Sequence, residues 1–314
     1  MLSRTADNLY WLSRYAERAD FLARILDAAL RLAALPSSYG GRTSNEWASA
    51  LSSAGDPELF KTLYDTANEH TVCNFLAFSP HNPSSIRSCI ATARENARSI
   101  RTALTTEMWD TINGAWLELR SYEGRDLSRD EFTQFLDWVK RVSLTFDGSA
   151  YRTMLRNDAY WFTRAGTAIE RADNTARILD VKYHVLLPDA EQIGGSLDYV
   201  QWSAILRAVS ALTAYHWVYK ESLKPWLVAD LLILNDQMPR SLAACYESIV
   251  RNLDSVSLAY GRQGPAQRAA RAIRTKLENA RIDDIFQAGL HEFVTDFIAD
   301  NNRLGSAITQ QYLA

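Results

Sequence analysis

An eleven-residue segment that occurs twice places the tightest constraint on how this chain folds. Residues Glu17–Asp27 and Glu170–Asp180 lie 153 positions apart and are identical at nine of eleven positions. Chance does not produce such a match in a chain of 314 residues, so the sequence contains an internal duplication. We expect residues 1–150 to form a first helical repeat and residues 151–314 a second, packed together as one compact unit.

Other residue types recur at nearly the same spacing. Trp47 is matched by Trp202 at an offset of 155 residues. Six further residues recur at an offset of 156: Val72, Leu76, Pro83, Ser85, Cys89 and Asn96 are matched by Val228, Leu232, Pro239, Ser241, Cys245 and Asn252. Because the offset drifts by only three residues, each half repeats the same series of elements, and this predicts a pseudo-twofold arrangement.

The repeated elements are predicted to be helices. Apolar residues recur at three- and four-residue spacing in the first segment, and this stripe consists of Leu9, Leu12, Ala16, Ala19, Ala23, Leu26 and Leu30. The chain contains only 13 Gly and 8 Pro residues and no alternating strand pattern of useful length. These features predict an all-α fold, a helical bundle built from a tandem internal duplication with pseudo-twofold symmetry.

Capping and turn residues predict where individual helices begin and end. Ser3 or Thr5 is expected to cap the first helix, because a hydroxyl at this position satisfies free backbone amides. We expect one helix over about 57–78 and another over about 128–146. A connection at 147–149 then leads into the second copy, since it contains an Asp-Gly-Ser sequence.

Composition narrows the class of protein. The formal net charge is −3, so no basic excess indicates nucleic-acid binding. The most apolar run, Trp226–Leu234, contains Asp230 and is far shorter than the ~20 residues that span a bilayer. The first residues lack the apolar core of a secretory signal, and three cysteines without a Cys-x-x-Cys motif indicate reduced thiols. We therefore expect a soluble, cytoplasmic protein with no membrane or nucleic-acid partner.

The duplicated segment also carries the candidate functional residues. On a helix with 100° per residue, Glu17 and Arg24 lie only about 20° apart. Tyr10, Arg14 and Asp20 lie within about 60° of that glutamate, on the side opposite much of the apolar stripe. The candidate ligand or interface residues of both copies are Tyr10, Arg14, Glu17, Asp20, Arg24, Glu170, Asp173 and Arg177.

This polar face has three interpretations. It can be a solvated surface on which Asp20–Arg24 and Asp173–Arg177 form i,i+4 ion pairs, each contributing only ~0.2–0.5 kcal/mol. It can be a buried lattice of Glu and Arg side chains between the two halves. It can also be a ligand cleft, in which guanidinium groups bind carboxylates or phosphates and a glutamate serves as base. The presence of Glu, Arg, Asp and Arg in both copies favours the second and third interpretations over the first.

Metal-dependent and nucleophilic catalysis have little support in the sequence. The five histidines are scattered, and no Glu-x-x-His or His-Glu-x-x-His pattern occurs. The carboxylates of Glu17, Asp20, Glu170 and Asp173 suit Mg²⁺ by type, but the neighbouring arginines argue against a metal there. The cysteines occur in apolar helical contexts and are expected to be packing residues. We predict no metal and no cofactor, and no catalytic residue is assigned.

Several motifs together resemble those of a known family. They are the opening segment Met1–Tyr15, the Glu-Arg-Ala-Asp sequences at 17–20 and 170–173, and Glu95–Arg98 followed by Thr106–Trp109. In this combination the chain closely resembles the bacterial alpha-E domain family over essentially its whole length. One departure is that Gly166 and Thr167 stand where the first copy has Ser13 and Arg14, so the two copies are not equivalent as sites.

The resemblance implies an all-helical fold and an association with particular enzymes. It does not identify a catalytic residue. Members of that family are encoded beside, or fused to, circularly permuted ATP-grasp peptide ligases and transglutaminase-like cysteine peptidases. Our leading hypothesis from the sequence is therefore a non-catalytic helical partner that docks an ATP-grasp ligase or presents its peptide substrate. The alternative is an enzyme or a binder of a small carboxylate, phosphate or peptide ligand, with a Glu/Arg site between the two repeats.

Overall fold

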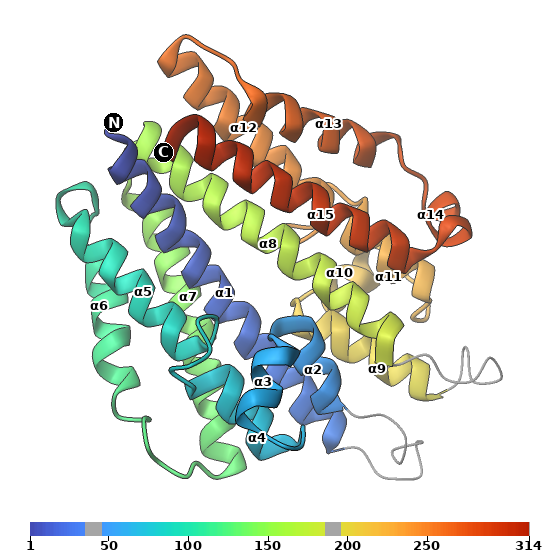
Figure 1. The fold of residues 1–314 in the computed structure, drawn as a ribbon. Helices are drawn as coiled ribbons and strands as arrows, with labels where there is room; N and C mark the ends of the chain where they lie inside the picture. Colours follow the sequence, from blue (N-terminus) through green and yellow to red (C-terminus); the bar gives the residue numbers. More distant parts are fainter. Residues whose placement is uncertain (35–45, 186–195, 314) are drawn as a thin grey trace.

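The structure of the protein is a computed structural model that describes residues 1–34, 46–185 and 196–313 (Figure 1). Every regular element in these three ranges is a helix, which confirms the predicted all-α class. Within the same ranges, no helix combines the length and the apolar character needed to cross a lipid bilayer.

The described residues form α-helices that range from about one turn to eight turns. In chain order they are α1 (Ser3–Ala33), α2 (Glu46–Ala54), α3 (Pro57–Leu63), α4 (Glu69–Cys73), α5 (Ile86–Ser99), α6 (Thr106–Leu119), α7 (Arg129–Thr153), α8 (Asp158–Val185), α9 (Ser196–Ala208), α10 (Leu212–Tyr219), α11 (Pro225–Ile233), α12 (Leu242–Tyr260), α13 (Pro265–Asn279), α14 (Ile282–Ala288) and α15 (Leu290–Ile308). Two π-helical turns follow α4 and α15, at Asn74–Phe78 and Thr309–Leu313.

The two helices that carry the duplicated segment, α1 and α8, lie side by side at the centre of the molecule (Figure 1). They start next to each other, because the amino group of Met1 bonds the carboxylate of Asp158 at 2.9 Å. α1 packs against α5 and α7, and α8 packs against α12 and α15. In turn, α6 contacts α5 and α7, and α13 contacts α12 and α15. Each central helix therefore has a similar set of neighbours.

The predicted apolar stripe of α1 is buried. Leu9, Leu12 and Ala16 pack with residues of α5, α6 and α7, whereas the rest of the stripe lies in the main core with α8. Because α1 is covered by helices on several sides, its polar face is buried as well. Buried charges are tolerated only when they are paired, so this position dictates the ion pairs described below.

The predicted continuous helix over 57–78 is wrong. α3 ends at Leu63, and a separate helix, α4, starts at Glu69. Asn68 explains the restart, because its side chain accepts a hydrogen bond from the amide of Thr71 while the Thr71 hydroxyl accepts one from the amide of Asn68. This reciprocal capping box is a strong helix start, and it outweighs the helical periodicity that continues across the break.

The start of α1 also differs from the prediction. Neither Ser3 nor Thr5 caps the helix, since both lie within it and Leu2 occupies the cap position without a side-chain hydrogen bond. The helix end is anchored instead by the ion pair between Met1 and Asp158. A tertiary contact with the start of α8 thus takes the place of the local cap.

Helix α7 is longer than predicted. It begins as expected after Ser128, which caps it, but it continues through 147–149 and ends at Thr153. Phe146 and Ala150 are buried against the neighbouring helices. Their burial outweighs the low helix propensity of the intervening glycine, so no connection forms there. The boundary expected after Ala150 falls in the last turn of this helix.

Candidate functional site

The two copies of the duplicated segment face each other where α1 and α8 approach closely. A Cβ atom on Gly166 would lie 2.4 Å from the carbonyl oxygen of Tyr10 and 2.3 Å from Oγ of Ser13, so only glycine fits at this point. Small residues continue the contact, and Ala19 and Ala172 are buried. The close approach brings the Glu-Arg sequence of each helix within reach of the other helix.

The two Glu-Arg dipeptides, Glu17-Arg18 and Glu170-Arg171, bond each other reciprocally. Nε and Nη2 of Arg171 donate hydrogen bonds to Oε1 and Oε2 of Glu17, at 3.0 and 2.8 Å. Nε and Nη2 of Arg18 donate to Oε1 and Oε2 of Glu170, at 2.6 and 3.2 Å. Each glutamate therefore receives two hydrogen bonds from one guanidinium group of the opposite helix, the arrangement in which arginine–carboxylate pairs are strongest.

Each glutamate also has a second arginine. Arg240, in the turn before α12, donates from Nη1 to Oε1 of Glu17 at 2.8 Å. Arg14 donates from Nε to Oε2 of Glu170 at 2.7 Å, and its guanidinium carbon lies 4.6 Å from the ring centroid of Trp11. The result is a buried lattice of two carboxylates and four guanidinium groups. We call its six residues the Glu-Arg seam: Arg14, Glu17, Arg18, Glu170, Arg171 and Arg240.

The seam keeps both glutamates ionised. Burial by itself would raise the pKa of the Glu17 carboxyl, but the adjacent guanidinium groups of Arg171 and Arg240 outweigh it and hold the pKa well below its ordinary value. Burial acts in the same direction on Glu170, where the guanidinium groups on α1 again prevail and lower the pKa to about 2. Neither carboxylate therefore takes up a proton near neutral pH.

On one side of the seam, which we call the closed side, the remaining charged groups are held by several partners. Nε of Arg24 donates to Oδ2 of Asp20 at 2.7 Å, and its Nη1 donates to the carbonyl oxygen of Ala208 and to Oγ of Ser210. Asp20 also accepts a hydrogen bond from Nη2 of Arg240 at 2.8 Å. Asp20 is 1% exposed and receives two guanidinium groups.

On the other side, which we call the open side, the pairing is less complete. Nε of Arg177 donates to Oδ2 of Asp173 at 2.5 Å, and the Arg177 side chain is 37% exposed. Asp173 receives this one guanidinium group, and its Oδ1 is buried without a hydrogen-bond partner, as is Oδ1 of Asp20 on the closed side. Nδ2 of the neighbouring residue, Asn174, is likewise buried and without a partner.

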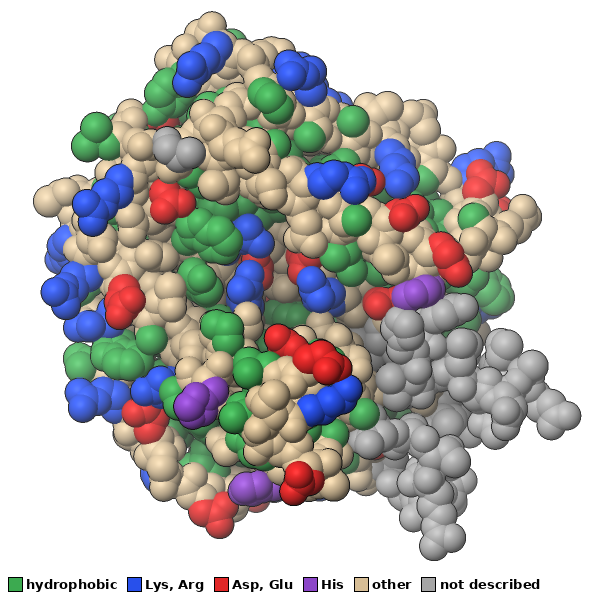
Figure 2. Space-filling model, in the orientation of Figure 1, with side chains coloured by type: hydrophobic (Ala, Val, Ile, Leu, Met, Phe, Trp, Pro, Cys, Tyr) green, Lys and Arg blue, Asp and Glu red, His purple; other side chains and the backbone are tan. Residues whose placement is uncertain are grey.

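A cavity of about 280 Å³ lies on this open side, and we call it the open-side cavity. It is lined by residues of α1 and α8, by the C-terminal end of α2 and by the turn before α5. Asp173, Asn174 and Arg177 are among the lining residues. Figure 2 shows a hollow near the centre of this face, over α1 and α8, with acidic and basic side chains at its base. The cavity thus adjoins both copies of the motif.

Comparison with known proteins identifies the family. The family model Alpha-E, described as a predicted alpha-helical domain with a conserved ER motif, matches residues 1–313. This chain belongs to the Alpha-E family. In this Alpha-E chain the two Glu-Arg dipeptides of the seam carry the ER sequence. No curated protein matches the chain, and no solved structure does so either.

All eight candidate residues predicted from the sequence of this Alpha-E chain lie in the seam or beside it, but they do not form a solvated face. That interpretation is wrong, because Glu17 and Glu170 are only 3% and 2% exposed. Tyr10 is fully buried, and its hydroxyl accepts a hydrogen bond from Nη1 of Arg14 at 3.3 Å. The two predicted i,i+4 pairs form. The seam has the geometry of the second interpretation, a buried lattice of Glu and Arg side chains. The third interpretation, a ligand cleft, requires a cavity, and the open-side cavity lies beside the seam.

Sequence reasoning missed three residues of the seam. Arg18 and Arg171 occur in both copies, which is a signal, but each points about 100° away from its own glutamate around the helix. Each of these arginines instead bonds the glutamate of the other copy, on the opposite helix. Arg240 carried no such signal, because Ser84 stands at the corresponding position of the first half.

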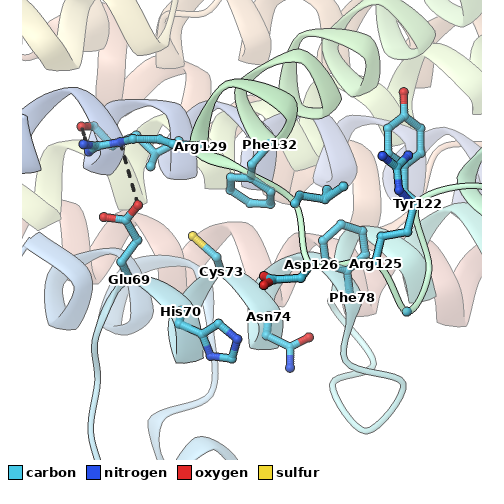
Figure 3. A pocket seen from close by; sticks show the side chains of 13 residues that line it. Glu69, His70, Cys73, Asn74, Phe78, Tyr122, Arg125, Asp126, Arg129 and Phe132 are labelled. Carbon is cyan, nitrogen blue, oxygen red and sulfur yellow. Dashed lines mark hydrogen bonds and ion pairs between the residues drawn. The ribbon is translucent and has the colours of Figure 1, made fainter.

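A larger cavity, of about 720 Å³, lies between α4 and α7 (Figure 3). Burial raises the pKa of the Cys73 thiol far above its ordinary value, and Glu69 adds to the effect, so the thiol is protonated at neutral pH. In Figure 3 the sulfur of Cys73 points toward Phe132, whereas the imidazole of His70 points away from it. Cys73 and His70 therefore lack the arrangement of an activated Cys–His nucleophile.

The other two cysteines of this Alpha-E chain are buried packing residues. Cys89 and Cys245 are free thiols that are at most 2% exposed, and burial raises the pKa of each to about 12. Among the described residues, no group of three or more His, Cys, Asp and Glu side chains is placed to hold a metal ion.

Proposed function

We propose that this Alpha-E chain is a non-catalytic binding protein that holds a small polar ligand in the open-side cavity and presents it to an enzyme of amide-bond metabolism. The observation that carries the proposal is that Asp173 and Asn174 both line this cavity and each has a buried polar atom, Oδ1 and Nδ2 respectively, without a hydrogen-bond partner. Each such atom costs ~1–3 kcal/mol, which a ligand that bonds both would recover. The volume of about 280 Å³ suits an amino acid or a short peptide end.

The state of the seam supports binding over catalysis. A general base works best when its pKa lies near the working pH. The pKa values of Glu17 and Glu170 lie far below neutrality, and both carboxylates already accept hydrogen bonds from two arginines. Through these ion pairs the two glutamates hold α1 and α8 together, and the resulting arrangement of the helices shapes the cavity beside them.

The proposed partner is an ATP-grasp-type amide ligase in the bacterial cytoplasm. Its support is the resemblance to a family whose members accompany circularly permuted ATP-grasp ligases and transglutaminase-like peptidases. Two large aromatic side chains also favour a protein partner, because Trp217 on α10 and Trp226 on α11 are 77% and 46% exposed. The two helices that carry these rings, α10 and α11, contact each other.

A thermal-shift screen tests ligand binding. Amino acids, short acidic peptides and ATP are added to the wild-type protein, and at least one of the amino acids or peptides is expected to raise the melting temperature. Asn174→Leu keeps the branched shape of the side chain and removes the buried amide, so this variant should lose the shift. Asn279→Leu, at an exposed position on α13, is the matched control and should keep it.

Two results would contradict the proposal. The first is turnover of a peptide or of ATP by the purified protein alone, since the chain is proposed to have no catalytic activity. The second is a pull-down from native cells that repeatedly recovers this protein without a ligase or peptidase. A shift that survives Asn174→Leu would show that the ligand binds elsewhere.

A further inference from the structure

The turns before α5 and α12 are built alike but differ in one residue. Ser85 and Ser241 cap the two helices, and each hydroxyl also donates to a carbonyl oxygen six residues earlier. A proline stands two positions before each cap. The residue between them is Ser84 in the first turn and Arg240 in the second.

On the closed side, Arg240 fills the space beside the seam. Its Nη1 and Nη2 atoms donate to Glu17 and Asp20, both at 2.8 Å, so one guanidinium group bridges two carboxylates that are three residues apart on α1. The Arg240 side chain is only 13% exposed. A planar cation is thus buried against two carboxylates at this position.

On the open side, the corresponding carboxylates lack such a cation. Glu170 and Asp173 are three residues apart on α8, and both line the open-side cavity together with Ser84. Ser84 is too short to reach them as Arg240 reaches its partners, and its Oγ accepts a hydrogen bond from Nη1 of Arg18 at 3.3 Å. The cavity therefore occurs where the side chain at position 84 is small.

The two sides have the same numbers of ion-paired cations and carboxylates. The closed side has three guanidinium groups and two carboxylates, those of Arg24, Arg171, Arg240, Glu17 and Asp20. The ion pairs of the open side likewise contain three guanidinium groups and two carboxylates, those of Arg14, Arg18, Arg177, Glu170 and Asp173, and the exposed Asp56 also lines the cavity.

We infer that the open-side cavity binds a ligand through a guanidinium group, which takes the position that the Arg240 guanidinium group has on the closed side. This inference rests on the proposed ligand-binding function and specifies its ligand class. The guanidinium group donates to the carboxylates of Glu170 and Asp173, as the guanidinium group of Arg240 donates to those of Glu17 and Asp20. Nδ2 of Asn174 and the exposed nitrogen atoms of Arg177 donate to an acceptor on the same ligand, such as a carboxylate. Free arginine, or a peptide that ends in arginine, carries both groups.

Soluble probes test the ligand class directly. L-arginine is expected to raise the melting temperature of the wild-type protein in a concentration-dependent manner. L-citrulline has nearly the same shape without the charge and should give no shift, and L-glutamate should give none. Asp173→Asn should abolish the arginine shift. A shift with glutamate or an acidic peptide that is lost in Asn174→Leu, with none from arginine, would overturn the guanidinium class and leave the proposed function intact.

A substitution tests the same geometry without an added ligand. Ser84→Arg supplies the guanidinium group from the chain itself, as Arg240 does on the closed side. We expect this variant to melt a few degrees above Ser84→Gln, an uncharged and shorter polar control, and to lose all response to L-arginine. If Ser84→Arg melts at or below Ser84→Gln, the cavity does not accept a guanidinium group and the inference fails. If no probe binds and Ser84→Arg is not stabilised, the proposed function fails with it.

Discussion

Replacing Glu170 by glutamine tests the role of the seam most directly. The substitution keeps the shape of the side chain and removes the charge, so it leaves Arg14 and Arg18 buried without their carboxylate partner. The pKa of Glu170 falls from 4.5 to about 2 in the folded protein. A difference of about 2.5 units at ~1.36 kcal/mol per unit corresponds to ~3 kcal/mol of stability. This agrees with the ~3–5 kcal/mol that breaking a buried ion pair costs.

The same pKa shift predicts how the effect depends on pH. Because the pKa of Glu170 is lower in the folded than in the unfolded state, its stabilising contribution is complete above pH 4.5 and is lost as the pH falls toward 2. The difference in unfolding free energy between the wild-type protein and Glu170→Gln should therefore be largest near pH 7 and should shrink between pH 5 and pH 3.

Urea denaturation followed by circular dichroism at pH 7, 5 and 3 measures this difference. Glu95→Gln, at an exposed position on α5, is the matched control and should change the unfolding free energy by less than about 0.5 kcal/mol. A loss below about 1 kcal/mol for Glu170→Gln at pH 7 would refute a buried and uncompensated pair. A difference that stays constant from pH 7 to pH 3 would show that the charge is not its cause.

Further substitutions and probes examine other parts of the structure. Glu17→Gln should destabilise the protein as clearly as the change in the other copy, measured by the same urea titration. Gly166→Ala should lower the melting temperature, because its Cβ would lie 2.4 Å from a carbonyl oxygen of α1; an unchanged melting temperature would show that the two helices are not in close contact. Cys89 and Cys245 should not react with a thiol reagent at pH 8 until urea unfolds the chain, since both thiols are buried with pKa values of about 12. Ser128→Ala should cost about 1 kcal/mol through the lost cap of α7, and a neutral result in the urea titration would contradict that role.

The sequence alone determined the features that depend on neighbours along the chain. Three- and four-residue periodicity predicted the helices and the buried stripe of α1, because one helix turn relates residues that are close in sequence. The repeated segment identified the two glutamates of the seam, Glu17 and Glu170, since identical side chains at matched positions mark a shared environment. Where a local signal competed with packing, as in α7 at 147–149, the prediction was wrong because burial of its neighbours decided the outcome.

Only the tertiary structure decided which charges meet. Glu17 and its partner Arg171 are 154 residues apart, and Arg240 is 223 residues from the same glutamate, so no periodicity within one helix relates them. Their distances follow from how closely α1 and α8 approach at Gly166, and from a turn that carries an arginine in one half and a serine in the other. The same polar face is therefore buried rather than solvated, and a cavity lies on its open side, because packing between distant segments determines the solvent exposure of each charge.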